Sequence, residues 1–303
     1  MTPESDRLLA PAGAGAPRKF PSWRADAALV GNTIIWGSTF VLVQSALHDI
    51  SPLAFLAIRF SIATLALILL FRGRIRFSVA AKAGMLAGIC LFSGYVFQTV
   101  GLQFTTAAKS AFITGLSIPM VPLLASLVYF TRPRILEVVG VIFATTGMGL
   151  MTLQGANFRI GLGDLLTLFC AAAFAMHMIA LGHYSTRVGF ESVAFLQVAA
   201  SAVLALGSFW WAESPVLRLR PLVLVALLVT GLLATALAFT VQAWAQQHTT
   251  PTRTALIYSL EPVVAWVTSF LLTGETLSRR GMAGAGMILA GILLVELKRV
   301  HSQ

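Results

Sequence analysis

TTPTRTALIYSLEPVVAWVTSFLLTG, residues 249–274, decides the fold class of this chain because it is long enough and apolar enough to cross a lipid bilayer. It places a carboxylate, Glu261, and a proline, Pro262, near its middle. A second stretch, residues 105–130, reads TTAAKSAFITGLSIPMVPLLASLVYF. It shares the opening Thr-Thr and a basic residue four places after the first threonine. The chain is therefore predicted to contain the same membrane element twice.

Composition points to lipid as the solvent of this chain. Hydrophobic residues make up 57% of its 303 positions and charged residues only 11%, which is more apolar surface than a soluble domain can bury. The formal net charge of +10 could indicate nucleic acid, but the basic residues lie in short clusters between long apolar runs. We expect a lipid bilayer, and no nucleic acid, as the partner.

The two cysteines carry no sign of redox or metal chemistry. Cys90 and Cys170 lie within apolar segments, and neither has a second ligand at metal-binding spacing. They predict neither a disulfide nor a metal site, and we expect them to pack between helices. The chain is expected to bind no cofactor.

Apolar runs of about 20 residues predict ten membrane-spanning helices, separated by short connections with turn-forming residues. The predicted spans of the first half are 27–47, 52–71, 83–103, 107–130 and 135–153. Those of the second half are 165–184, 193–211, 222–246, 252–274 and 281–297.

This arrangement divides the chain into two repeats and two tails. Residues 1–26 are predicted to form a flexible cytoplasmic tail, 27–155 the first repeat, 160–297 the second repeat, and 298–303 a short cytoplasmic tail. Basic loops resist translocation, and the densest basic cluster lies between the second and third spans. Both termini are therefore expected in the cytoplasm.

Matching residues at one fixed offset support an internal repeat. Beyond the two Thr-Thr pairs, the informative matches are Gln98 with Gln242, Gln103 with Gln247, Gly140 with Gly284 and Gly147 with Gly291. A repeat with an odd number of spans must insert upside down relative to its copy. The predicted fold is an all-α membrane protein of ten transmembrane helices in two inverted five-helix repeats, an architecture typical of secondary transporters.

Five motifs carry a resemblance to a known family. They are Trp36-Gly37-Ser38 with Phe40, PLAFLAIR at 52–59, SLEPVVA at 259–265, GETL at 274–277, and the glycine-rich segment 284–291. Together they resemble the drug/metabolite transporter superfamily, specifically its ten-helix, EamA-like branch. The first repeat departs from the pattern, because Thr131-Arg132-Pro133 stands where the second has Gly-Glu. The resemblance implies a carrier in a bacterial inner membrane.

Residues three and four apart share a helix face, and several such polar stripes occur within the predicted spans. We take these stripes as walls of a central cavity, although hydrogen bonding between helices is an equally good reading of any one amide or hydroxyl. The predicted substrate-binding residues are Asn32, Trp36, Thr39, Gln98, Thr114, Ser117, His177, Tyr184, Gln242, Tyr258 and Glu261.

Glu261 is the most informative of these residues, because a charge at mid-span is costly unless it has a function or a partner. It could bind the amino group of a substrate, take up a coupling proton, or hold helices together through Arg59 on the second span. His177 is an alternative proton acceptor.

Prolines and basic residues mark the ends and middle of the same two helices. Pro119, Pro122 and Pro262 are expected to bend them. Lys109 and Arg253, which open these helices, are expected to reach the lipid headgroups, with gating as the alternative reading.

No catalytic motif is present in the sequence, so we expect a transporter and not an enzyme. The expected substrate is a small metabolite, an amino acid above all. Resemblance to the aromatic amino-acid exporters of the superfamily implies export, and an aromatic wall is expected from Trp36, Phe97, Phe174, Tyr258 and Trp266. A broad drug or cation exporter and a non-transporting membrane scaffold remain the alternatives.

Small residues recur at helical spacing in the third and tenth spans. They allow two helices to approach closely, as at 84–88, 281–285 and 286–290. We expect these ridges to pack inside one bundle, so the chain is predicted to be a monomer, with a dimer as the alternative.

Overall fold

The computed structural model describes residues 22–105, 107–130, 132–152, 161–261, 263, 264, 267 and 278–300. Pro262, Trp266, the motif at 274–277 and residues 1–21 and 301–303 of the predicted tails lie outside these residues, as does the side chain of Lys109. The first helix begins at Ser22 and not at Ala27, so the end of the predicted N-terminal tail is helical.

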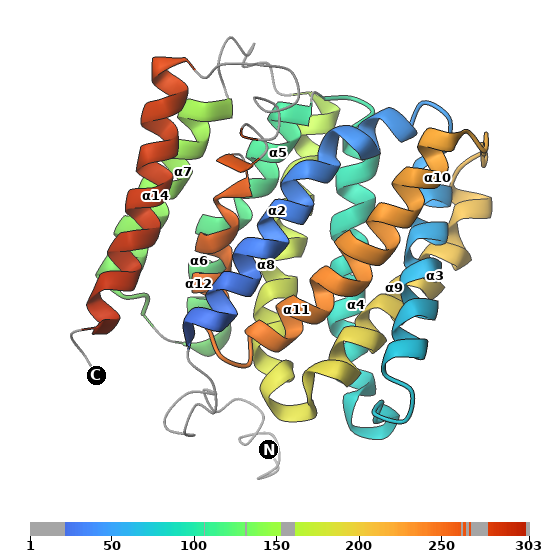
Figure 1. Ribbon diagram of the computed structural model, residues 1–303, viewed down its shortest axis with the longest axis horizontal. Coiled ribbons are helices and arrows are strands. Elements are labelled where there is room, and N and C mark those ends of the chain that lie inside the picture. Colours follow the sequence, from blue (N-terminus) through green and yellow to red (C-terminus); the bar gives the residue numbers. More distant parts are fainter. Residues whose placement is uncertain are drawn as a thin grey trace.

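Helices make up the described part of the chain, which contains no strand (Figure 1). The elements are α2 (Ser22–Ala46), α3 (Pro52–Leu70), α4 (Phe77–Gly101), α5 (Ala107–Gly115), α6 (Ser117–Tyr129), α7 (Ile135–Thr152), α8 (Leu162–Val188), α9 (Phe190–Ala212), α10 (Pro221–Leu228), η1 (Val229–Leu237), α11 (Ala238–Ala245), α12 (Pro251–Tyr258) and α14 (Arg279–Val300).

Length and hydropathy qualify much of this bundle for a membrane. Among the described residues, 7 helical stretches are long and apolar enough to cross a bilayer, and a shorter apolar helix runs over Ile135–Leu150. Exposed leucines and phenylalanines lie on the outside of the bundle, where lipid would surround them. The prediction of an all-helical membrane fold is confirmed.

Two predicted spans are interrupted. The span at 107–130 breaks at Leu116 into α5 and α6, because Pro119 and Pro122 lack the N–H groups that would continue the helical hydrogen bonds to Gly115 and Ile118. The expected bend therefore lies at the start of the proline pair. The eighth span contains a π-helical segment, η1, which the sequence reading missed.

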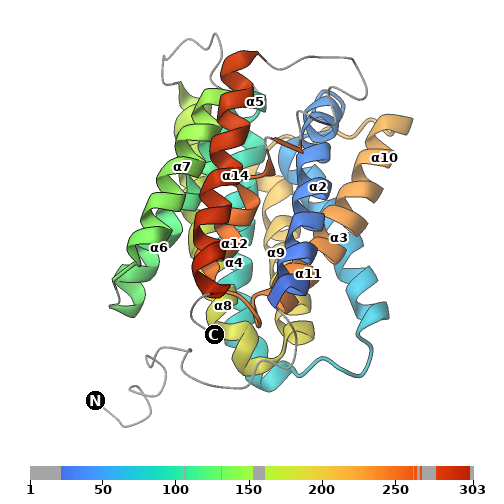
Figure 2. The same ribbon diagram turned by 60° about the vertical axis from the view of Figure 1, so that its left-hand side comes forward.

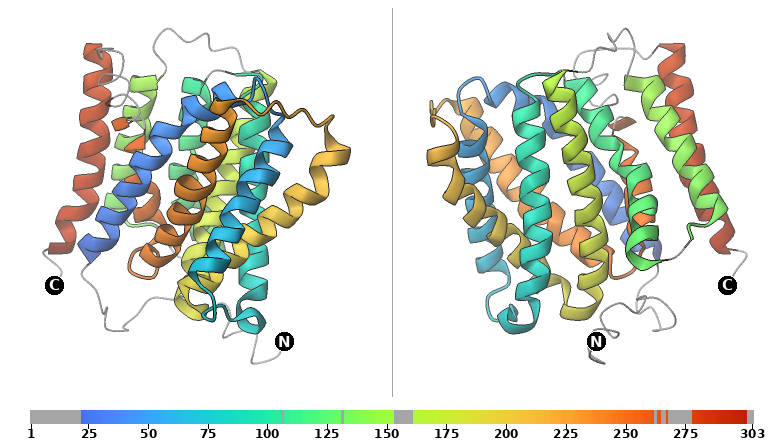
Figure 3. Two further views of the ribbon diagram at one scale, coloured as in Figure 1. Left: turned by 45° about the vertical axis from the view of Figure 1, so that its right-hand side comes forward. Right: turned by 180° about the vertical axis from the view of Figure 1, so that it is seen from behind.

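Close packing of small residues holds the bundle together. α4 lies against α8 and α9 (Figure 3, right), and its Gly84 and Gly88 face Leu196, Gln197 and Ala200 of α9 so closely that a methyl group would collide. The ridge at 84–88 thus packs inside the bundle, as predicted.

α7 and α14 form a pair at one side of the molecule (Figures 1 and 2). A Cβ at Gly147 would lie 2.5 Å from the carbonyl oxygen of Gly284, and one at Gly291 would lie 2.6 Å from that of Gly140. The four glycines that match between the repeats therefore meet each other at this crossing.

Candidate functional site

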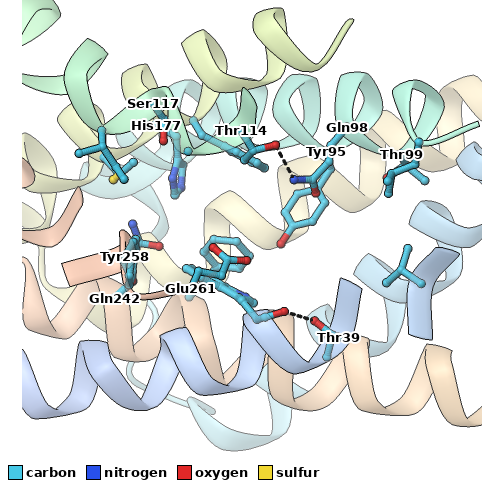
Figure 4. A pocket seen from close by; sticks show the side chains of 18 of the residues that line it. Thr39, Tyr95, Gln98, Thr99, Thr114, Ser117, His177, Gln242, Tyr258 and Glu261 are labelled. Carbon is cyan, nitrogen blue, oxygen red and sulfur yellow. Dashed lines mark hydrogen bonds between the residues drawn. The ribbon is translucent and has the colours of Figure 1, made fainter. Parts of the chain in front are cut away.

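A cavity of about 110 Å³ lies at the centre of the bundle, bounded by helices from both halves of the chain (Figure 4). Polar and aromatic side chains share its wall. The lining residues are Trp36, Thr39, Val43, Arg59, Tyr95, Gln98, Thr99, Leu102, Thr114, Gly115, Ser117, Ile118, Phe174, His177, Met178, Phe239, Gln242, Tyr258 and Glu261.

One wall comes from α4, α5 and α8. Gln98 donates its amide N–H to the hydroxyl of Thr114 at 3.2 Å, and this hydroxyl lies 3.8 Å from the sulfur of Cys170. The helix break at Leu116 places Thr114 and Ser117 on either side of the interruption, and both line the cavity. This wall therefore offers hydroxyl and amide groups to a ligand.

The facing wall comes from α2, α11 and α12, and it is aromatic. The ring of Trp36 packs edge-on against Tyr258 with centroids 4.9 Å apart and lies 5.4 Å from Phe239. The indole N–H of Trp36 donates to the carbonyl of Ala234 at 2.9 Å, which fixes the ring plane. Asn32 supports this wall from behind by donating to the carbonyl of Ala238 at 2.8 Å.

Glu261 follows the turn that ends α12 and lies on the cavity wall beside Tyr258 (Figure 4). No ion pair or hydrogen bond joins its carboxylate to another residue in the described part of the chain. Across the cavity lie Thr114, Ser117 and Gln98. The carboxylate is thus available to a ligand in this conformation.

Arg59 does not pair with Glu261, which corrects the predicted structural partnership. Its guanidinium donates to the hydroxyl of Thr235 at 2.7 Å, to the hydroxyl of Tyr95 at 3.0 Å and to the carbonyl of Ala234 at 3.3 Å. Because these three acceptors bind the guanidinium, Arg59 lines the cavity without contacting the carboxylate of Glu261.

His177 and Gln242 are held by neighbouring amides. A ring nitrogen of His177 lies 2.7 Å from the side-chain oxygen of Gln197, and the ring packs edge-on against Phe239. Gln242 donates to Gln246 at 3.5 Å, which in turn donates to the carbonyl of Met178 at 3.0 Å. Both residues line the cavity. His177 also joins α8 to α9 through Gln197, whereas Gln242 bonds within its own helix and Gln246 makes the contact with α8.

Most of the predicted site residues line this one cavity, and two do not. Asn32 is a supporting residue, and Tyr184 lies outside the cavity, where its ring packs against His183. Phe97 also faces away and contacts Phe169.

The sequence reading missed Tyr95, Thr99 and Phe239. Tyr95, Gln98 and Thr99 share one face of α4 at helical spacing, so extending the stripe from Gln98 would have found Tyr95 and Thr99. Phe239 lies three residues before Gln242 on α11, so extending the stripe from Gln242 would have found it.

A model described as the EamA-like transporter family matches the chain twice, over residues 23–153 and 161–297. The chain belongs to the EamA-like transporter family. It is accordingly a multi-pass membrane transporter, and the predicted superfamily is confirmed.

Relatives of known sequence agree with this assignment. An uncharacterised transporter of Archaeoglobus fulgidus is 35% identical over 274 residues, which cover 90% of this chain and 86% of that protein. YedA of Escherichia coli K12, described as an uncharacterised inner membrane transporter, is 26% identical over 277 residues, or 89% of this chain and 90% of YedA.

The fold is also similar to that of a solved protein. A chain described only as "Crystal structure of protein" superposes with a TM-score of 0.75 at 19% sequence identity, covering 90% of this chain and 98% of that one. At this identity the likeness supports the fold alone.

Proposed function

We propose that this EamA-like transporter is a secondary carrier that exports small zwitterionic metabolites of the amino-acid class by alternating access. The observation that supports this most is the central cavity, which combines an aromatic wall with separate groups of opposite charge, Arg59 and Glu261. A neutral or zwitterionic organic solute needs apolar surface for its body and a few placed polar groups for its orientation.

Cavity size favours a small solute. One water molecule needs about 10–15 Å³ of such space, so a volume of about 110 Å³ holds on the order of ten waters. A single amino acid is in this size class, whereas a large drug molecule would require the cavity to expand. Trp36, Phe174, Phe239 and Tyr258 would receive an apolar or aromatic side chain.

Alternating access is supported by a barrier at one end of the cavity. Arg253 at the start of α12 makes a bidentate ion pair with Asp26 near the start of α2, at 2.9 and 2.6 Å, and both side chains are largely buried. The lining residues Val43 and Leu102 lie toward the opposite ends of α2 and α4. The cavity therefore extends away from the ion pair.

The second family match supports a related contact at the other end. Asp164 stands at the same position within this match as Asp26 does within the first. It accepts a hydrogen bond at 2.6 Å from Thr105, which is the repeat counterpart of Thr249. We infer that the two halves are inverted copies, a view supported by the opposite directions of α2 and α8 in the bundle (Figure 3), and that each aspartate serves one gate.

The orientation follows from the basic residues. The exposed Arg72, Arg74 and Arg76 lie between α3 and α4, at the same end of the bundle as Asp26. Since basic loops stay in the cytoplasm, the Asp26–Arg253 pair is proposed as the cytoplasmic gate, with both termini on that side. Residues 27–155 and 160–297 then form the two functional repeats.

A broad exporter of organic cations is the second candidate. It is favoured by the carboxylate of Glu261, which has no cation partner in the described part of the chain and lies among aromatic rings. In that case, Glu261 recognises the solute by its positive charge alone.

Flux measurements distinguish these functions. The purified chain is reconstituted into proteoliposomes, and uptake of radiolabelled amino acids and of organic amines and quaternary ammonium compounds is compared with that of empty liposomes. We expect saturable flux of one or more amino acids. Flux of cations alone would favour the second candidate, and no flux for any solute would indicate a membrane scaffold.

A further inference from the structure

Arg59 has a position that its role as a structural residue does not explain. Its side chain is almost completely buried in the middle of the bundle, with 4% of the residue exposed, and it belongs to the cavity wall. No carboxylate forms an ion pair with it in the described part of the chain. A buried charge in a membrane without a counter-ion is costly and usually marks a functional site.

The guanidinium is held on one side and open on the other. Its Nε and Nη2 atoms donate to Thr235, Tyr95 and Ala234, and its carbon lies 4.3 Å from the centroid of the Tyr95 ring. Nη1 has no acceptor among the residues that the structure describes. One edge of the arginine fork is thus fixed by the protein, and the remaining donors are left for a ligand.

The π-helical segment η1 builds this arrangement. The carbonyl of Ala234 accepts from Trp36 as well as from Arg59, and the hydroxyl of Thr235 donates to the carbonyl of Thr230, five residues earlier. Gly231 allows α3 to approach, since a Cβ there would lie 2.9 Å from Ile62. Wide turns of this kind often occur at functional sites, and here one positions a cation.

We propose that Arg59 binds the carboxylate of the transported solute and thereby selects carboxylate-bearing substrates. Nη1 keeps its N–H donors, and charge-assisted hydrogen bonds from a guanidinium to a carboxylate are stronger than bonds between neutral groups. Its single positive charge balances the single negative charge of a carboxylate. This inference rests on the proposed function and narrows its substrate class.

Matched solutes test the inference on the full-length protein in proteoliposomes. One series is phenylalanine, phenethylamine, which lacks the carboxylate, and 3-phenylpropionate, which lacks the amine; the second is leucine, isopentylamine and 4-methylpentanoate. We expect the amine of each series to be transported or to compete at least tenfold more weakly than its amino acid. The Arg59→Gln variant should lose this preference, so that amino acid and amine differ by less than about threefold.

Arg74→Gln is the matched control, because Arg74 is exposed in the connection between α3 and α4 and should leave the preference unchanged. Size-exclusion profiles and helical circular dichroism establish that each variant is folded. Should Arg59→Gln not fold, Arg59→Lys keeps the charge and loses the Nη1 donors, and a drop in the preference for the amino acid is again expected.

Three results would overturn the inference. They are equal transport of amine and amino acid by the native protein, transport of the amines alone, and an unchanged preference in a folded Arg59→Gln variant. The native solute series can still overturn the inference if neither variant folds. Absence of flux for every solute would instead refute the proposed function, so the two failures are distinguishable.

Discussion

At the scale of single residues, an arginine and a glutamate, Arg59 and Glu261, line one cavity without forming an ion pair with each other. The sequence predicted Glu261 as a functional carboxylate, because a charge at mid-span is rarely accidental. It also suggested Arg59 as the partner, since the two are prominent opposite charges within apolar spans. Arg59 instead donates hydrogen bonds to Tyr95, Thr235 and Ala234, and no pattern in the sequence places these three acceptors together.

Replacement of Glu261 by glutamine tests whether its carboxylate binds the solute. Glu261→Gln keeps the side-chain shape and removes the negative charge, so we expect transport of an ammonium-bearing solute to fall at least about tenfold, equivalent to about 1.4 kcal/mol. Thermal stability should change little, because the carboxylate has no described structural partner. Initial rates in proteoliposomes measure the effect.

Glu137→Gln serves as control, since among the described residues that carboxylate accepts only from the backbone N–H of Arg134 at a helix start. The same assay across pH addresses coupling. Loss of the pH dependence in Glu261→Gln would assign the coupling proton to this residue, and unaltered rates would remove Glu261 from the binding site.

At the scale of elements, departures from regular helix produce the site. The break between α5 and α6 was predictable from Pro119 and Pro122, because proline removes a helical donor wherever it stands. The π-helical η1 was not, since its apolar sequence has no residue type that specifies a wide turn. Its geometry follows from contacts with α3 and with Trp36, which form only in the folded bundle.

The ion pair between α2 and α12 carries a prediction about gating. Asp26→Asn removes one charge of a largely buried bidentate pair, and such a loss costs about 3–5 kcal/mol in the state that contains the pair. We expect the population to shift toward the state open at that end. In a background lacking Cys90 and Cys170, this shift is detectable as increased alkylation of a cysteine introduced at Ser185, a buried residue near the C-terminal end of α8. Unchanged alkylation would argue against a gate.

Asp49→Asn is the matched control at the opposite end. Asp49 lies 3.4 Å from Arg220, whose side chain is 65% exposed, so this pair contributes only about 0–1 kcal/mol. Its loss should leave the alkylation rate unaltered.

The crossing of α7 and α14 predicts a clear effect of one methyl group. Gly147→Ala would place Cβ 2.5 Å from the carbonyl oxygen of Gly284. The clash can be relieved only by shifting the backbone of one helix, which costs free energy. We expect destabilisation by about 1–3 kcal/mol, seen as a lower melting temperature in detergent. Gly286→Ala, with nothing within 4 Å of its added Cβ, should melt like the native protein. Equal melting temperatures for both variants would contradict this account of the crossing.

At the scale of the whole molecule, topology is the property most open to a direct test. Arg74 and Arg218 lie beyond opposite ends of α3, and both are exposed. In a background lacking Cys90 and Cys170, we expect Arg218→Cys to react with a membrane-impermeant maleimide in intact cells. Arg74→Cys should react only after permeabilisation, and the reverse pattern would place the termini outside.

The sequence by itself determined that the chain lies in lipid, that it is helical and to which family it belongs. Apolar runs of membrane length form helices in lipid, because each backbone group must find its hydrogen bond within its own segment. Helical spacing also identified much of the cavity wall. Only the tertiary structure decided which partner each charge finds. Side chains at 59, 95 and 235 lie far apart along the chain, and their hydrogen bonds depend on how α3, α4 and η1 pack, which local spacing does not encode.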